Sequence, residues 1–246
     1  MAYALLCGWM YATQRSHMYF PTLPSTAAHA QAWWIESAAE RIKVWEVARS
    51  GPSALLYFGG NAEDVAGTVE SLREALPDRS LYLVNYRGYG GSTGRPTETG
   101  LREDAIAIYD AVRRRHDEVV VMGRSLGSGV AMQLAAARPV ERLVLVTAFD
   151  SLANVAAAHF PWLPVRALLK DRYDSARRAG DVSAPVLMVI ASHDEVIPRA
   201  NSDALASAFR PGQGDVVVVP GVGHNTLDLS TEYLQSVRRF LAPSSD

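Results

Sequence analysis

The chain has 246 residues, of which 48% are hydrophobic, and its formal net charge is −2. This length and apolar content can bury one large core, which favours a single α/β domain over residues 1–246. A near-neutral charge, without a basic run interleaved with aromatic residues, argues against nucleic acid as a partner. Cys7 is the only cysteine, which excludes an internal disulfide and a cysteine-based zinc site.

The chain begins with an apolar segment, residues 1–12, followed by Gln14 and Arg15. The segment is too short to span a bilayer, which takes about 20 residues, and it lacks the features of a signal peptide. We expect a helix that packs on the body of the protein. Two alternatives are peripheral contact of residues 1–20 with a membrane interface and the remnant of a longer anchor. The sequence leaves the compartment unassigned.

The next residues predict an α/β protein. Two strands, of which the second alternates at period two, predict an antiparallel hairpin at a sheet edge. From Ser53 onward strands alternate with helices, which implies a mostly parallel eight-stranded sheet with helices on both faces. The strands are expected at 32–36, 41–47, 54–58, 81–86, 118–122, 143–147, 185–191 and 215–219, and the helices at 62–76, 97–115, 130–137, 199–209 and 226–241, with Asp228 in the first turn of the last helix.

Residues 151–180 interrupt this alternation. Pro161 and Pro164 break any helix there, and a short helical run is expected at 165–170. An irregular apolar insertion at this place predicts a cap, or lid, over a lipophilic pocket. Its apolar side chains suggest an acyl-binding surface: Phe160, Trp162, Leu163 and Leu168.

The strand at 118–122 leads into a candidate nucleophile. It ends in Gly123-Arg124-Ser125-Leu126-Gly127 and passes directly into a helix, which places Ser125 on a sharp strand-to-helix turn. The two glycines are needed because a Cβ at either site would clash in so tight a turn. The turn exposes the Ser125 hydroxyl at the carboxyl edge of the sheet. A serine in an ordinary βα turn is the alternative, since such pentapeptides also arise by chance.

A serine nucleophile needs a base, and the base needs an acid that orients it. His224 follows the last predicted strand and lies at the same sheet edge as Ser125; a histidine that only caps the closing helix is the alternative. Asp194, which follows the strand at 185–191, is the expected acid. Asp150 is its rival at the same edge, and Glu195 is a weaker third.

The other histidines are not assigned to the chemistry. His17, His29 and His116 are expected in surface segments. His159 lies in the insertion and is expected to line or cover the pocket. His193 precedes the better acid.

An acyl-transfer site also needs two donors for its oxyanion. The N–H of Leu126 supplies one, and the turn at 59–62 supplies the other, with the N–H of Asn61 best placed. A purely structural tight turn is the alternative. The loop at 88–94 fails the Gly-x-Gly-x-x-Gly spacing because Thr93 occupies the third glycine position, so we interpret it as a loop packed beside the nucleophile.

These motifs together resemble the α/β-hydrolase superfamily, in which the triad follows in the order Ser, Asp, His. The likeness covers about residues 19–241 and is closest to the serine-aminopeptidase-like branch, which includes membrane-associated lysophospholipid lipases, protein depalmitoylases and their bacterial relatives. Gln14-Arg15 before Tyr19-Phe20-Pro21 is similar to the junction after an N-terminal membrane anchor in that branch. The chain departs from the pattern at Gly59, where many relatives have His, and in its short apolar segment. The stretches that carry the likeness are Phe58-Gly59-Gly60-Asn61-Ala62-Glu63-Asp64, Asn85-Tyr86-Arg87-Gly88-Tyr89-Gly90-Gly91-Ser92, Gly123-Arg124-Ser125-Leu126-Gly127-Ser128-Gly129, His193-Asp194 and Gly223-His224.

The resemblance implies the α/β-hydrolase fold, Ser125, Asp194 and His224 as the triad, and Asn61 and Leu126 as oxyanion donors. The expected activity is hydrolysis of small-molecule carboxylic esters or thioesters through an acyl-enzyme, with no cofactor, no metal and no obligate protein partner. A peptidase or amide hydrolase on the same triad is one alternative. A non-catalytic lipid-binding or interaction module is the other.

Overall fold

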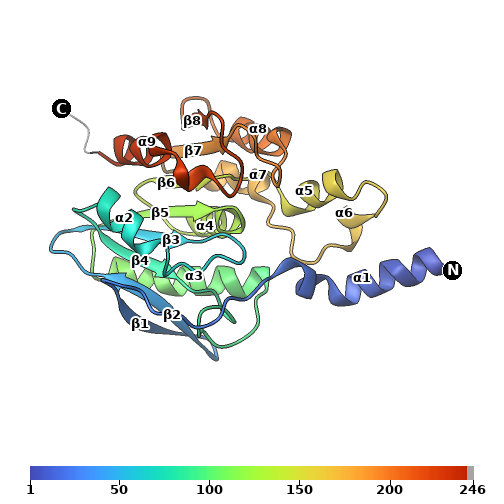
Figure 1. Cartoon of the computed structure of the whole chain (residues 1–246), viewed down its shortest axis with the longest axis horizontal. Helices are drawn as coiled ribbons and strands as arrows, with labels where there is room; N and C mark the ends of the chain where they lie inside the picture. Colours follow the sequence, from blue (N-terminus) through green and yellow to red (C-terminus); the bar gives the residue numbers. More distant parts are fainter. Residues whose placement is uncertain (243–246) are drawn as a thin grey trace.

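The computed structural model describes residues 1–242 and is organised around one eight-stranded sheet (Figure 1). The strand order is β1-β2-β4-β3-β5-β6-β7-β8. β2 runs antiparallel to both of its neighbours, β1 and β4, and all other neighbouring pairs are parallel. The predicted edge hairpin and mostly parallel sheet are therefore confirmed. The strands are β1 (Gln31–Ser37), β2 (Glu40–Val47), β3 (Ser53–Phe58), β4 (Ser80–Val84), β5 (Glu118–Arg124), β6 (Leu143–Val146), β7 (Val186–Ala191) and β8 (Gly214–Val219).

Helices cover both faces of the sheet. Side chains of α2 and α9 pack on one face, and side chains of α3, α4 and α8 pack on the other. The bounds are α1 (Ala2–Met18), α2 (Val69–Ala75), α3 (Glu98–Arg113), α4 (Leu126–Ala137), α5 (Leu152–His159), α6 (Val165–Leu168), α7 (Ser175–Arg178), α8 (Arg199–Ala208) and α9 (Thr231–Leu241), with 3-10 turns at Ala179–Asp181 and Leu227–Leu229.

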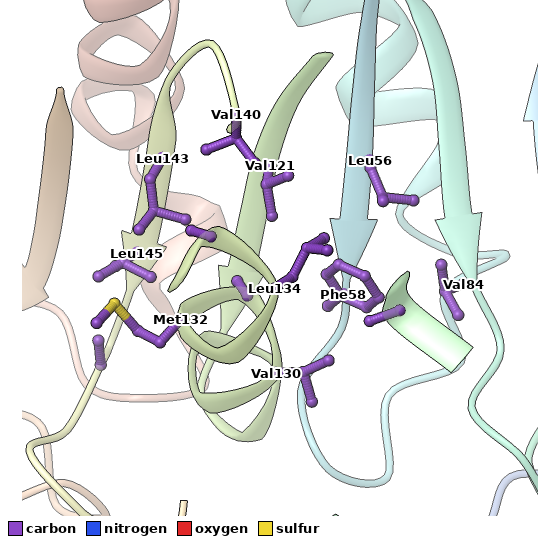
Figure 2. Close-up of a cluster of buried hydrophobic side chains, with 14 of the residues drawn as sticks. Leu56, Phe58, Val84, Val121, Val130, Met132, Leu134, Val140, Leu143 and Leu145 are labelled. Carbon is purple, nitrogen blue, oxygen red and sulfur yellow. The ribbon is translucent and has the colours of Figure 1, made fainter. Parts of the chain in front are cut away.

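The central strand β5 is buried on both sides. Val119 and Val121 join the core layer beneath α3 and α4, whereas Val120 and Met122 join the layer beneath α2 and α9. Figure 2 shows the first layer, in which side chains of α4 lie over Val121 and its neighbours on adjacent strands. Burial on both faces explains the uninterrupted apolar run, which is typical of parallel strands. This packing fixes the end of β5, and with it the position of Ser125.

The helix predicted over residues 62–76 is shorter in the structure, because α2 begins only at Val69. The carboxylate of Glu63 accepts hydrogen bonds from the N–H of Gly60 and from the hydroxyl of Thr68. Such side-chain bonds compete with helix formation and hold the residues before α2 in turns.

The closing helix also starts later than predicted. α9 begins at Thr231, and Asp228 lies before it in a 3-10 turn rather than in its first helical turn. This places the Asp228 carboxylate beside the end of β5, where it forms an ion pair with Arg124.

The segment at 151–180 contains more helix than predicted. Ser151 caps the unpredicted helix α5, since its hydroxyl accepts the N–H of Asn154 at 3.1 Å. The break at the two prolines is confirmed, because α5 ends before Pro161 and α6 follows Pro164.

The N-terminal helix α1 is longer than the apolar segment that predicted it. Gln14 anchors it to the segment at 151–180: its amide nitrogen donates to the carbonyl of Leu168 at 3.1 Å, and its amide oxygen accepts the N–H of Lys170 at 2.7 Å. Toward the N-terminus the helix projects from the body of the protein (Figure 1). Within residues 1–242 no helix combines the length and apolarity needed to cross a bilayer.

His116 was expected at the surface, and this expectation is wrong. The residue is buried, and its Nε2 lies 2.9 Å from the hydroxyl oxygen of Tyr82 on β4. The chain turns from α3 into β5 at this point, which directs the imidazole against the sheet. Burial lowers the pKa of His116 because it disfavours the charged ring.

Candidate active site

Ser125 forms the whole connection between β5 and α4. Its φ of 50° is a left-handed value that a non-glycine residue rarely adopts and that stores backbone strain. Its N–H donates to the carbonyl of Val146 at 2.9 Å, which ties the turn to β6. The strand-to-helix elbow expected from the sequence is thus present.

The glycines on either side of Ser125 are required by close backbone approach. A Cβ on Gly123 would lie 2.2 Å from the carbonyl oxygen of Gly127, and a Cβ on Gly127 would lie 2.1 Å from that of Phe58. Neither clash can be relieved by a side-chain rotation because the obstacles are backbone atoms. The structure therefore confirms the expected need for glycine at both positions.

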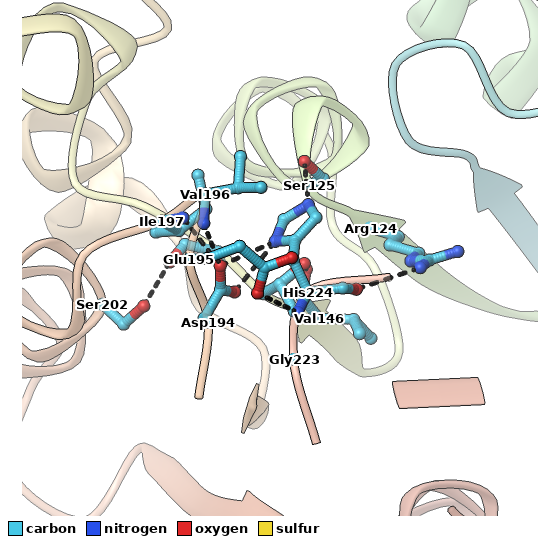
Figure 3. Close-up of polar contacts among 12 residues, drawn as sticks. Arg124, Ser125, Val146, Asp194, Glu195, Val196, Ile197, Ser202, Gly223 and His224 are labelled. Atoms are coloured by element: carbon cyan, nitrogen blue, oxygen red, sulfur yellow. Dashed lines mark hydrogen bonds and ion pairs between the residues drawn. The ribbon is translucent and has the colours of Figure 1, made fainter. Parts of the chain in front are cut away.

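Ser125, His224 and Asp194 lie together at the carboxyl edge of the sheet (Figure 3). Nε2 of His224 is 3.0 Å from Oγ of Ser125, and Nδ1 of His224 is 2.9 Å from Oδ2 of Asp194. The side chains of His224 and Asp194 are only 7% and 5% exposed. Because both side chains are buried, hydrogen bonds and interactions between charges are stronger here than in water.

The carboxylate of Asp194 is fixed by the backbone that follows it. Its Oδ1 accepts the N–H of Val196 at 2.9 Å and the N–H of Ile197 at 2.7 Å (Figure 3). An ionised carboxylate only accepts hydrogen bonds, so the proton of the neutral His224 ring belongs on Nδ1. Nε2 is then left as an acceptor for the hydroxyl of Ser125.

The two rival acids are used elsewhere. Asp150 is buried and accepts hydrogen bonds from the side-chain amides of Asn154 and Asn201, the latter at 2.7 Å. Glu195 accepts the backbone N–H of His224 at 3.2 Å, so it holds the loop rather than the imidazole.

The turn expected to supply an oxyanion donor lies against Ser125. A Cβ on Gly60 would be 3.8 Å from the Cβ of Ser125. The N–H of Gly60 is occupied, because it donates to Glu63 at 2.6 Å. Within residues 1–242 the N–H groups of Asn61 and Leu126 make no hydrogen bond, so both can donate to a bound oxyanion.

The side chain of Asn61 ties this turn to the carboxyl end of α1, a link that sequence reasoning missed. Its amide nitrogen donates to the carbonyl of Met18 at 2.6 Å, and its amide oxygen accepts the hydroxyl of Tyr89 at 2.8 Å. Tyr89 belongs to the glycine-rich loop, which therefore packs beside the site.

Arg124 links the turn that contains Glu63 to the loop that contains His224 and Asp228. Sequence reasoning also missed this residue. Its guanidinium lies 2.9 Å from the carboxylate of Asp228 and 3.7 Å from that of Glu63, and it donates to the carbonyl of His224 at 3.2 Å (Figure 3). Burial alone would lower the pKa of Arg124. The nearby acidic groups, among them Asp228 and Glu63, outweigh this effect and raise the pKa above its ordinary value, so the group is a cation. A charged residue at the end of a buried strand was the available signal.

An apolar cavity of about 400 Å³ opens on one side of Ser125. Phe160 and Leu163 line it as expected, as does His159. Trp162 is instead exposed, and Leu168 faces a smaller cavity against α1. Unexpectedly, α1 supplies part of the wall, through Met10, Gln14, His17 and Met18.

A second cavity, of about 320 Å³, also borders Ser125 and is polar. His224 lies in its wall, together with the residues that surround Arg124. Its lining comprises Gly60, Asn61, Ala62, Glu63, Arg124, Ser125, His224, Asn225 and Asp228. The candidate nucleophile thus sits at the junction of an apolar and a polar space.

Comparison with known proteins gives one consistent family. The sequence model described as the alpha/beta hydrolase family matches residues 57–180. An uncharacterized Mycobacterium tuberculosis protein, Rv2307c, is 43% identical over 205 residues, which cover 80% of this chain and 72% of the mycobacterial one. The human protein ABHD12B is 31% identical over 224 residues, covering 79% of this chain and 62% of the human one. Among solved structures, the Pyrococcus furiosus esterase Pf2001 has a similar fold, with a TM-score of 0.75 at 15% identity over 91% of this chain and 98% of the esterase.

Proposed function

Because this chain belongs to the alpha/beta hydrolase family, we propose that it is a serine hydrolase that cleaves carboxylic esters or thioesters through an acyl-enzyme on Ser125. The observation that carries the proposal is the 3.0 Å contact between Oγ of Ser125 and Nε2 of His224, beside a cavity that fits an acyl chain. The esterase activity named for a protein of the same fold is consistent with it.

In the proposed reaction, Oγ of Ser125 attacks the carbonyl carbon while His224 takes the hydroxyl proton. Asp194 holds the ring tautomer and stabilises the imidazolium, and the N–H groups of Asn61 and Leu126 bind the oxyanion. The bond to the leaving oxygen or sulfur then breaks, and the leaving group takes the proton from His224. Water attacks the acyl-enzyme by the same route, which releases the carboxylic acid and restores Ser125.

The apolar cavity favours substrates whose acyl group has a medium or long chain. Its walls are mostly aliphatic and aromatic, and each buried methylene contributes about 0.8 kcal/mol of binding. Among residues 1–242, no Asp or Glu that would pair with the ammonium group of an aminoacyl substrate lines this cavity. An unpaired buried charge is costly, so this cavity favours fatty acyl esters over the alternative of an aminopeptidase substrate.

The direct test is Ser125→Ala on a series of p-nitrophenyl esters, with a fluorophosphonate probe as a second readout. Loss of a nucleophile of this kind costs about 10⁶ in kcat, and the variant is expected to lose labelling. Ser207→Ala, on the exposed part of α8, is the matched control. Full activity of Ser125→Ala would rule out the assignment, and a wild-type protein that neither labels nor hydrolyses would support a non-catalytic module. An amide matched to the best ester separates ester from amide hydrolysis.

We also propose that α1 and the tip of the insertion contact a membrane surface. Leu5, Trp9 and Trp162 are 70%, 54% and 59% exposed. The hydroxyl of Tyr3 donates to the carbonyl of Trp162 at 2.8 Å, which holds α1 and the tip side by side. Phe160, also exposed, lines the apolar cavity as well. The exposed apolar surface is thus continuous with the proposed acyl site, as expected where acyl chains enter from a lipid layer.

A further inference from the structure

The position of His224 distinguishes the two cavities at Ser125. In the proposed reaction the leaving group takes its proton from Nε2 of His224, so it departs on the side of the imidazole. His224 and Asn225 line the polar cavity, whereas neither lines the apolar one. If the acyl chain fills the apolar cavity, the leaving group must occupy the polar one.

From this geometry we infer that the polar cavity binds the leaving group and selects an uncharged, hydroxyl-rich alcohol over an anionic one. The inference rests on the proposed hydrolase function and adds the chemical class of its leaving group. The residues that carry it are Asp228, Glu63, Arg124 and Asn225.

The charge of the cavity argues against an anionic leaving group. Two carboxylates, Glu63 and Asp228, face one guanidinium, that of Arg124. The side chain of Arg124 is 13% exposed, and its guanidinium is already engaged by Asp228 and by the carbonyl of His224. A phosphate or carboxylate entering the cavity would therefore meet net negative charge, and like charges brought together disfavour binding strongly.

The free hydrogen-bonding capacity of the cavity suits hydroxyl donors. The carboxylate of Glu63 is largely occupied, since it accepts three hydrogen bonds, from Gly60, Tyr57 and Thr68. The side chain of Asp228 is 53% exposed, and its carboxylate has lone pairs beyond those used by Arg124. Together with the exposed amide of Asn225 in the same lining, the cavity offers acceptors that hydroxyl groups can satisfy.

The experiment compares 1-decanoylglycerol with 1-decanoylglycerol 3-phosphate, two esters that share an acyl chain and differ in leaving-group charge. We expect kcat/KM of the wild-type protein to be about tenfold or more higher for the neutral ester. Asp228→Asn is expected to lower this ratio at least about threefold, and Asn225→Asp, which adds a carboxylate to the same cavity, to raise it. Asp215→Asn, at the amino end of β8, removes the same charge outside the cavity and is expected to keep the wild-type ratio.

A ratio near one, a preference for the phosphate ester, or a ratio unmoved by both cavity variants would overturn the inference. The ratio is informative even if Asp228→Asn lowers overall activity, because damage to the site alone would affect both esters equally. Failure of the proposed function looks different: p-nitrophenyl decanoate is not hydrolysed and the fluorophosphonate probe does not label Ser125.

Discussion

Asp194 holds His224 through a 2.9 Å contact between Oδ2 and Nδ1, while its Oδ1 is occupied by two backbone N–H groups. An asparagine in its place would direct its amide oxygen to those N–H groups and its amide nitrogen to Nδ1. The ring proton would then sit on Nε2, facing Ser125, which is the wrong tautomer for a base. We expect Asp194→Asn to lower kcat by about 10⁴ while the protein remains folded, as measured by ester kinetics and thermal unfolding.

Asp150→Asn is the comparison for this prediction. Asp150 accepts two side-chain amides away from the imidazole, so its replacement is expected to lower stability more than kcat. Equal losses of kcat in the two variants would contradict the assignment of Asp194.

Gly127→Ala is expected to destabilise the protein, although replacing a helical glycine by alanine usually stabilises. At a compatible site, Gly→Ala stabilises by about 0.4–1 kcal/mol. At Gly127 the new Cβ would lie 2.1 Å from the carbonyl oxygen of Phe58 and 2.6 Å from that of Gly59, which leads into the oxyanion turn. We expect a loss of about 2 kcal/mol or more in urea unfolding, with reduced activity. Gly180→Ala, where nothing lies within 4 Å, is expected to stay within about 0.5 kcal/mol of wild type.

The grouping of Ser125, Asp194 and His224 at one sheet edge could be predicted from the sequence because each residue follows a strand with its own local signal. Ser125 lies between two required glycines, and Asp194 and His224 follow apolar runs that form β7 and β8. Parallel strands bring such residues to one edge whatever the details of packing.

What could not be predicted depends on contacts between residues distant in sequence. Gln14 bonds to Leu168, 154 residues away, and this contact seats α1 in the wall of the apolar cavity. No local pattern encodes that pairing. The same holds for Arg124, whose partner Asp228 lies in a turn that periodicity assigns to a helix.

Acyl-chain preference is expected to respond to the bulk of Ala156. This residue of α5 lines the apolar cavity, whereas Ala158, two positions along the helix, does not. A tryptophan at 156 would occupy space needed by the distal methylenes, each worth about 0.8 kcal/mol. We expect Ala156→Trp to lower the ratio of decanoate to acetate hydrolysis about tenfold or more, and Ala158→Trp to leave it near wild type. A similar ratio in both variants would place the acyl chain elsewhere.

His116 is expected to make folding stability depend on pH. Because burial lowers its pKa in the folded protein, the unfolded chain binds more protons once the pH falls below about 6.5. The contribution of His116 to stability is therefore present above that pH and is lost on acidification. We expect His116→Gln, which keeps a polar group near Tyr82, to show a flatter stability profile between pH 7.5 and pH 5. A profile parallel to that of wild type, measured by urea unfolding, would assign the pH dependence to other groups.

The proposed membrane contact is tested by placing negative charge on α1 at positions that lie outside the lining of the apolar cavity. Leu5 and Trp9 are exposed and do not line that cavity. Burying two such side chains in a lipid interface contributes about 1.5–3 kcal/mol each, so Leu5→Glu with Trp9→Glu is expected to lower vesicle co-sedimentation about tenfold or more. Hydrolysis of a water-soluble acetate ester is expected to be unchanged, because Leu5 and Trp9 line neither cavity at Ser125. Val216→Glu, an exposed apolar position on β8, controls for added charge. Unchanged sedimentation of the double variant would exclude α1 as the contact, whereas a fall in both sedimentation and acetate hydrolysis would mean that α1 supports the fold of the site instead.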